Sequence, residues 1–197
     1  MINEQLAFVE QLIASRQTVL PKRLIEPGPD DEQINRLCLA AAAAPDHGQI
    51  MPWRFLIIPQ NKRAALGELF ANALLERDDS ATAEQVSAAR DKAVRSPFLM
   101  LISVDEGKPP FEIDVHERVL SAGCAVQNIL LLATAMGYGC SLTSGKALKS
   151  TSLREALGLR DAEHAICFIN VGSIGSKKFP KIRPCTQTFV KVWGMYP

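Results

Sequence analysis

Apolar residues recur at every third or fourth position in several stretches of the chain, which is the spacing of one buried helix face. Near the N-terminus Leu6, Val9, Leu12 and Ile13 keep this spacing, and the prolines between positions 21 and 29 then indicate an extended connection. With helix start and stop signals added, the pattern predicts helices over residues 3–15, 30–44, 61–76, 82–95, 115–136 and 152–158.

Polar residues at the starts of these segments supply the expected caps. Asp30 and Asn61 stand where N-caps belong. Two further starts have capping-box spacing, Thr82 with Gln85 and Ser152 with Glu155. The longest helix is expected to end at Gly137, because glycine readily adopts the left-handed conformation of a C-terminal cap.

The remaining apolar runs predict strands. Residues 98–104 are almost wholly apolar, which favours a central strand covered on both faces. Shorter runs predict strands over 54–58, 139–142 and 164–171, and the alternation over 189–193 predicts one more. Strands separated by helices, with no linker or repeat, indicate one α/β-type domain over residues 1–197.

Composition narrows the possible partners. Apolar residues make up 47% of the chain and charged residues 22%, and the net charge is +1. A nearly neutral chain is a poor match to a polyanion, so no nucleic-acid partner is expected. The apolar stretch 119–136 is interrupted by Gln127 and Asn128, which favours a core helix over a membrane span.

The five cysteines are odd in number and widely spaced, which favours reduced thiols over a disulfide framework. The first residues carry neither a basic nor an apolar leader pattern. We therefore expect a cytoplasmic protein.

Motifs for chemistry by the chain's own side chains are missing from the sequence. The histidines at positions 47, 116 and 164 have no Cys or carboxylate at metal-ligand spacing, so no metal site is expected. The glycines at 137–139 and 172–175 fit neither a dinucleotide fingerprint nor a P-loop, and no nucleophile elbow occurs. An enzyme with this sequence would need a cofactor to carry its reaction.

Three short segments remain as candidates, and each has a plain structural alternative. Arg16-Gln17-Thr18 could grip a phosphate, or Arg16 could be an ordinary cation at a helix C-terminus. His47, in a polar loop between Pro45 and Pro52, could contact a ligand or simply stabilise a turn. Lys181 and Arg183 could bind one phosphate or belong to an exposed basic loop.

The order of these segments is more specific than any one of them. An Arg-x-Thr after the first helix, Ala44-Pro-Asp-His before Pro52-Trp-Arg-Phe, and Lys-x-Arg near the end follow one another. Ser121-Ala-Gly-Cys-Ala-Val and Gly137-Tyr-Gly, followed by Ser144-Gly, complete the series. This series resembles the FMN-dependent nitroreductase family, and within it the short YdjA-like branch of NAD(P)H nitroreductases, over about residues 12–183.

The resemblance implies an α+β fold with a mixed sheet flanked by helices, in an intertwined homodimer with FMN at the interface. It also implies NAD(P)H as reductant and a small-molecule acceptor such as a nitroaromatic or quinone. By position, the cofactor-binding residues would be Arg16, Gln17, Thr18, His47 from the other subunit, Leu142, Thr143, Ser144, Lys181 and Arg183. No residue is expected to act as a catalytic acid or base, and the alternating tail would pair across the dimer.

The chain departs from the family pattern near the expected flavin. Gln17 stands in place of a cation and Ala43 in place of an arginine; Met51 replaces a glutamine, and Leu142-Thr143 replace Trp-Arg. These losses leave a second hypothesis open, a flavin- or nucleotide-binding protein of the same fold without turnover. A third is a relative that uses reduced flavin differently, as in reductive dehalogenation or flavin breakdown.

Overall fold

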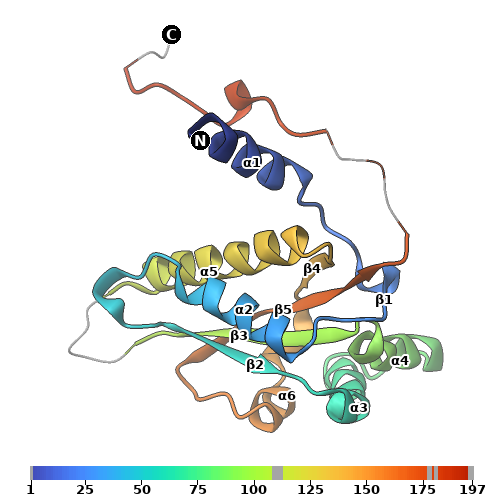
Figure 1. Cartoon of the computed structure of the whole chain (residues 1–197). Helices are drawn as coiled ribbons and strands as arrows, with labels where there is room; N and C mark the ends of the chain where they lie inside the picture. The colour runs from blue at the N-terminus through green and yellow to red at the C-terminus, as the bar shows by residue number, and fades with distance from the viewer. Residues whose placement is uncertain (1, 108–112, 177–178, 180–181, 195–197) are drawn as a thin grey trace.

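A five-stranded antiparallel sheet forms the centre of the computed structural model, which describes residues 2–107, 113–176, 179 and 182–194 (Figure 1). The strands are β1 (Leu24–Ile25), β2 (Trp53–Ile57), β3 (Phe98–Asp105), β4 (Gly139–Thr143) and β5 (Glu163–Ile174). The four longer ones confirm the predicted strands. The short β1 lies in the segment between residues 21 and 29 that was expected to be an extended connection.

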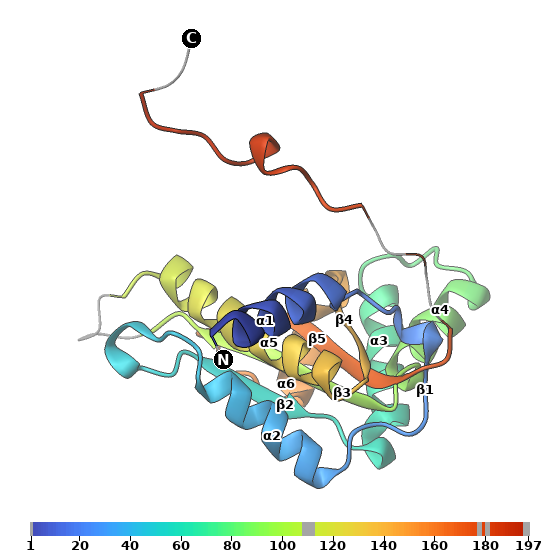
Figure 2. The same cartoon turned by 45° about the horizontal axis from the view of Figure 1, so that its top comes forward.

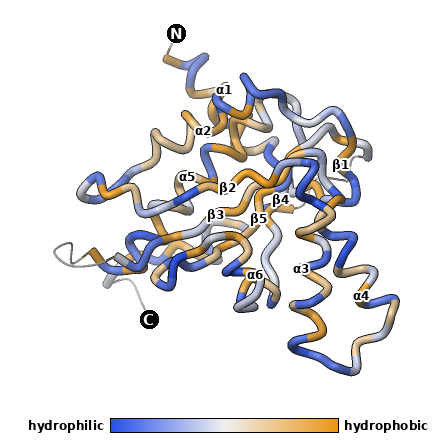
Figure 3. The backbone as a smooth tube through the Cα atoms, turned by 90° about the horizontal axis from the view of Figure 1, so that it is seen from below, coloured by the Kyte–Doolittle hydropathy of each residue, from blue (hydrophilic) through white to orange (hydrophobic). Residues whose placement is uncertain are grey.

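β5 organises the sheet because it pairs with three other strands. It pairs with β3, which in turn pairs with β2; it also pairs with β4 and, at its end, with β1. Val171 lies opposite both Phe98 and Cys140. The apolar β3 is buried from Phe98 to Val104, as its composition predicts, and Figure 3 shows the hydrophobic colour concentrated along these central strands.

Helices cover both faces of the sheet (Figure 1). One face packs against α2 (Asp31–Ala42) and α5 (Val115–Ala135), around a core that includes Met100, Ile129 and Ile169. The other face packs against α3 (Arg63–Leu75) and α6 (Thr151–Ala156), around Leu101 and Phe168, while α4 (Ala83–Arg90) packs on α3. The predicted α+β architecture is confirmed.

The long helix α5 is the one described helix whose length and composition would allow it to cross a membrane. It packs along the sheet and against α2, with Ala125, Ile129 and Ala133 fully buried. It ends as predicted, since Gly137 has a φ of 88°. The arrangement is that of the expected core helix.

Two of the four predicted caps are confirmed and two are wrong. Asp30 and Thr82 each accept a hydrogen bond from the residue three positions on, in complete capping boxes. Asn61 caps nothing, because the chain first makes a 3-10 turn over Gln60–Lys62. α6 is capped by Ser150, which accepts from the Leu153 amide, while the Ser152 hydroxyl donates to Glu76 of α3.

The predicted tail strand is also wrong within this chain. Residues 182–194 contain a 3-10 turn at Thr186–Thr188 and no strand, and all of them are exposed. Figure 2 shows this segment leaving the body of the protein. Apolar alternation alone does not make a strand, because the backbone also needs a neighbouring strand to bond to.

All five cysteines are free, as expected. Cys140 and Cys167 are buried in the core. Burial raises the pKa of the Cys167 thiol to about 11, so this thiol stays protonated and unreactive.

Candidate cofactor-binding site

The segment that follows α1 (Ile2–Ser15) is fixed along the free edge of β4. Thr18 forms a parallel bridge with Cys140, and the Val19 amide donates to the Cys140 carbonyl at 2.9 Å. Gly139 permits this close approach, since a Cβ there would lie 3.0 Å from the Val19 side chain and 2.9 Å from Leu24. The backbone at Thr18 and Val19 is thereby held beside the strand.

Arg183 meets Arg16 at the start of this segment, although the two are distant in sequence. The Arg183 guanidinium donates to the Arg16 carbonyl at 2.7 Å. Both side chains line a cavity of about 650 Å³ against α1 and α5, together with Glu10 and Gln127. Guanidinium groups offer forked donors that match phosphate oxygens, so this end of the segment suits a phosphate.

The other end of the segment opens into a second cavity, of about 640 Å³, between the end of β4 and the helices α3 and α4. Pro21 lines it, as do Thr143 and Ser144. Leu142 lies in the same strand, but its side chain alternates to the opposite face and is 45% exposed. The segment 16–21 thus connects a pair of arginines to a cavity at the end of β4.

Buried polar groups form one wall of this second cavity. Asn170 of β5 is 2% exposed and lines the cavity. Its side-chain amide donates to the Thr143 hydroxyl at 3.0 Å, and its carbonyl oxygen accepts from Ser96 at 3.0 Å. A buried, bonded side chain of this kind gives the wall a fixed geometry.

Positive charge surrounds the opening of the same cavity. Its charged lining residues are Arg77, Lys92, Arg95 and Lys146, with Asp78 as the one acidic residue. No ion pair joins any of these four cations to an acid within the described residues. The cavity therefore favours a ligand that carries or develops negative charge.

His47 lies beside the start of α5 and is not among the residues that line these two cavities. It is exposed in a short turn, and its Nδ1 lies 2.6 Å from Glu117 in the first turn of α5. β4 follows the opposite end of α5, and a helix of 21 residues is about 30 Å long. One chain alone does not bring His47 to Thr143.

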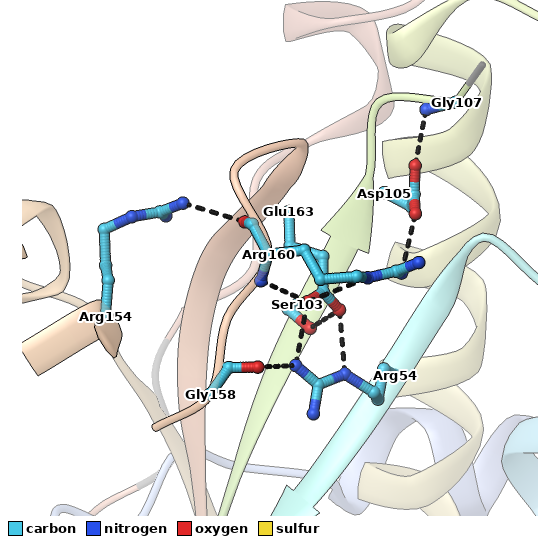
Figure 4. A network of polar contacts seen from close by, with 8 residues as sticks. All are labelled: Arg54, Ser103, Asp105, Gly107, Arg154, Gly158, Arg160 and Glu163. Atoms are coloured by element: carbon cyan, nitrogen blue, oxygen red, sulfur yellow. Dashed lines mark hydrogen bonds and ion pairs between the residues drawn. The ribbon is translucent and has the colours of Figure 1, made fainter. Parts of the chain in front are cut away.

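A third cavity, of about 1070 Å³, lies beside the loop that carries His47, and ion pairs cross its wall (Figure 4). Glu163, 1% exposed, accepts two hydrogen bonds from Arg54 at 2.8 Å and one from Ser103 at 3.2 Å. Arg160 contacts Glu163 and Asp105. The hydrogen bonds from Arg54 are the main reason that the pKa of Glu163 is lowered to about 2. The Glu163 carboxylate is therefore ionised at neutral pH.

A sequence profile described as the nitroreductase family matches residues 13–173 of this chain. The chain belongs to the nitroreductase family. Proteins from Haemophilus influenzae and Escherichia coli K12, the latter YdjA, carry the name "Putative NAD(P)H nitroreductase". Each is 32% identical to this chain; the alignments cover 77% and 83% of this chain and 82% and 86% of the relatives.

Solved structures of this family share the fold. A nitroreductase-like protein from Bacillus cereus superposes with a TM-score of 0.81 at 21% identity, covering 94% of this chain and 96% of that one. A nitroreductase with bound FMN from Desulfitobacterium hafniense superposes with a TM-score of 0.65 at 17% identity, covering 93% and 97%. The family resemblance read from the motifs is confirmed.

The structure groups the predicted site residues unevenly. Arg16, Gln17 and Thr18 lie along β4 with Arg183 beside them, and Leu142, Thr143 and Ser144 lie at the strand's end. His47 is separate, and Lys181 lies outside the described residues. The sequence did not single out Asn170 or the cations around the cavity; Asn170 did carry a signal, as a polar residue inside the apolar run of β5.

Proposed function

We propose that this member of the nitroreductase family is an FMN-dependent oxidoreductase that uses NAD(P)H to reduce electron-poor acceptors such as nitroaromatics or quinones. One observation carries the proposal: a single segment, 16–21, joins a pair of arginines to a cavity with a fixed polar wall. A phosphate at one end and a flat polar ring at the other is the layout of FMN. The names of the relatives supply the NAD(P)H part of the proposal.

The residues present suit that cofactor. Arg16 and Arg183 would bind the phosphate, and Gln17 and Thr18 would face the ribityl chain, because they follow Arg16 along β4. Thr143 and Ser144 would contact the ring where β4 ends. When bound, FMN accepts a hydride from NAD(P)H and passes electrons to the acceptor.

The side chains of this chain have three tasks in that reaction: they bind the phosphate, orient the ring and set the charge around it. The cations at the cavity opening would favour a ring that gains negative charge on reduction. No described residue is assigned the role of acid or base. Protons would come from solvent.

A homodimer belongs to the same proposal. α1 has no buried residue, and its apolar side chains Leu6, Phe8, Val9 and Ile13 are exposed. In the tail Val192 is 55% and Trp193 97% exposed. A second copy would cover these surfaces, pair with the tail and bring the partner's His47 towards the flavin. A cytoplasmic location is part of the proposal and is supported by the free cysteines.

The purified protein tests these statements directly. We expect it to bind FMN, to be bleached anaerobically by NADH or NADPH, and to regain its colour when a nitroaromatic or quinone is added. Failure to take up FMN would contradict the cofactor assignment. Uptake without bleaching would instead favour the flavin-binding protein without turnover. Light scattering during gel filtration should give twice the chain mass.

A further inference from the structure

Thr143 and Asn170 form a polar pair at the position where this chain departs from the family pattern. Thr143 is the last residue of β4, and Asn170 lies on the neighbouring β5. Both line the same cavity, and the Asn170 side chain is almost completely buried. A buried amide needs acceptors for its NH₂ group and a donor for its oxygen. The orientation of the Asn170 amide therefore determines which hydrogen bonds its neighbours can make.

The neighbours of Asn170 fix which way its amide points. The main-chain carbonyl of Ser141 can only accept a hydrogen bond, and it lies 3.4 Å from Asn170 Nδ2. On the other side the Ser96 hydroxyl lies 3.0 Å from both Asn170 Oδ1 and the Phe98 carbonyl and has one proton for the two, so it accommodates this orientation, and the Ser141 carbonyl decides it. The NH₂ group of Asn170 therefore faces β4 and its oxygen faces Ser96.

This orientation also fixes the hydroxyl of Thr143. Asn170 Nδ2 donates to Thr143 Oγ1 at 3.0 Å, which uses a lone pair of that oxygen. A hydroxyl group has one proton to donate, and no hydrogen bond donated by Thr143 to a described residue is present. Because Thr143 lines the cavity, its proton is available to a ligand there.

We propose that Asn170 is a positioning residue that makes Thr143 a hydrogen-bond donor to an acceptor atom on the flavin ring. This inference rests on the proposed function, which puts the ring in this cavity. The oxidised ring carries carbonyl oxygens and unprotonated ring nitrogens along its polar edge, and all of them accept hydrogen bonds. Thr143 thus supplies a polar contact where the family pattern has an arginine.

Three variants of the full chain separate this role from simple packing. Thr143→Ser keeps the hydroxyl, whereas Thr143→Val keeps the shape and removes it. Asn170→Asp keeps the shape but, when ionised, turns the Thr143 proton away from the cavity, because a carboxylate can only accept. Circular dichroism and thermal unfolding of the FMN-free proteins report whether each variant folds.

The measurement is FMN affinity by fluorescence titration of the FMN-free protein, together with the visible absorption spectrum of bound FMN. We expect Thr143→Val and Asn170→Asp to bind FMN about three- to tenfold more weakly, the size of one neutral hydrogen bond. Both should shift the flavin absorption band in the same way. Thr143→Ser should restore both the wild-type affinity and the wild-type band.

The outcomes that overturn the inference differ from those that overturn the proposed function. If the wild-type protein binds no FMN, the proposed function fails. If it binds FMN and Thr143→Val matches it in affinity and spectrum, the function stands and the donor role of Thr143 is wrong. An unchanged Asn170→Asp contradicts the positioning role. Should Asn170→Asp not fold, the pair Thr143→Val and Thr143→Ser still decides whether Thr143 donates.

Discussion

The cavity crossed by the Arg54–Glu163 pairs and the cavity at the end of β4 are built from similar residue types but use them differently. In the first, Arg54 and Arg160 are paired with Glu163 and Asp105, and the charges neutralise one another (Figure 4). In the second, four cations surround the opening with one acid among them, and Thr143 keeps a donor free. The ion pairs of the larger cavity stabilise the folded protein, whereas the cations of the smaller cavity are available to bind a ligand.

The comparison shows why size does not identify a site. The cavity of about 1070 Å³ is the larger, yet four of its charged lining residues, Arg54, Arg160, Asp105 and Glu163, are already paired with one another. The cavity of about 640 Å³ is lined by four cations that form no ion pair with the described residues, and it is reached by the segment that carries Arg16. We therefore expect mutations at the first to change folding stability, and mutations at the second to change ligand affinity.

The largest effect should come from Glu163→Gln. This change leaves Arg54 and Arg160 without their shared buried anion and should lower the free energy of unfolding by about 3 kcal/mol. Urea denaturation measures the loss. Glu117→Gln, which disturbs an exposed pair with His47, is the matched control and should cost less than about 1 kcal/mol. Equal losses in the two variants would contradict the assigned role of the Glu163 pairs.

The pH dependence of the free energy of unfolding tests the same ion pairs, when the wild type is compared with Glu163→Gln. The pKa of Glu163 is about 2 in the folded protein and near 4.5 when unfolded. A lowered folded pKa stabilises the protein above the unfolded value, so this contribution is complete above pH 4.5 and declines as pH falls towards 2. Between about pH 5 and pH 3 the wild type should lose more stability than Glu163→Gln. Parallel curves for the two proteins would show that Glu163 is not the group responsible.

At the other cavity, Arg16→Ala and Arg183→Ala should change binding and leave folding almost unaffected. Losing one charge-assisted hydrogen bond to a phosphate costs about 1.5–3 kcal/mol, so FMN affinity should fall roughly ten- to a hundredfold. Riboflavin, which lacks the phosphate, is the control ligand, and its affinity should not change. A variant that weakens riboflavin and FMN equally would place Arg16 away from the phosphate.

Local patterns predicted the elements of this fold, and contacts between distant segments account for what they missed. The apolar run of β3 and the Asp30 and Thr82 caps follow from neighbouring residues, and the structure confirms them. Ser152 has the spacing of a cap, but its hydroxyl is taken by Glu76 from another helix. The tail alternates like a strand, but over residues 182–194 it pairs with no strand of the described part of the chain.

In the candidate site, too, some features follow from local sequence patterns and others depend on contacts between distant segments. The motifs pointed to Arg16 and Thr143 as candidates through the family resemblance, because each lies in one of the short segments whose order matches the family pattern. The role of Asn170 depends on the register that sets β5 beside β4, with Asn170 opposite Ser141. No local pattern specifies that register, so the polar wall of the cavity became visible only in the folded chain.

A small effect on stability is also expected for His47→Ala. This variant tests the comparison because His47 lies near the larger cavity but is proposed to contact the flavin. Its pair with Glu117 is exposed on both sides, and such pairs contribute about 0–1 kcal/mol. The free energy of unfolding in urea should therefore change by less than about 1 kcal/mol, while FMN affinity falls if the partner's His47 contacts the ring.

Mixing His47→Ala with Arg16→Ala chains provides the decisive control. In a mixed dimer one site combines both changes and the other has neither, so half of the sites should regain wild-type affinity. If no site recovers, His47 does not act across the interface, and its role is confined to the loop beside the Arg54–Glu163 pairs.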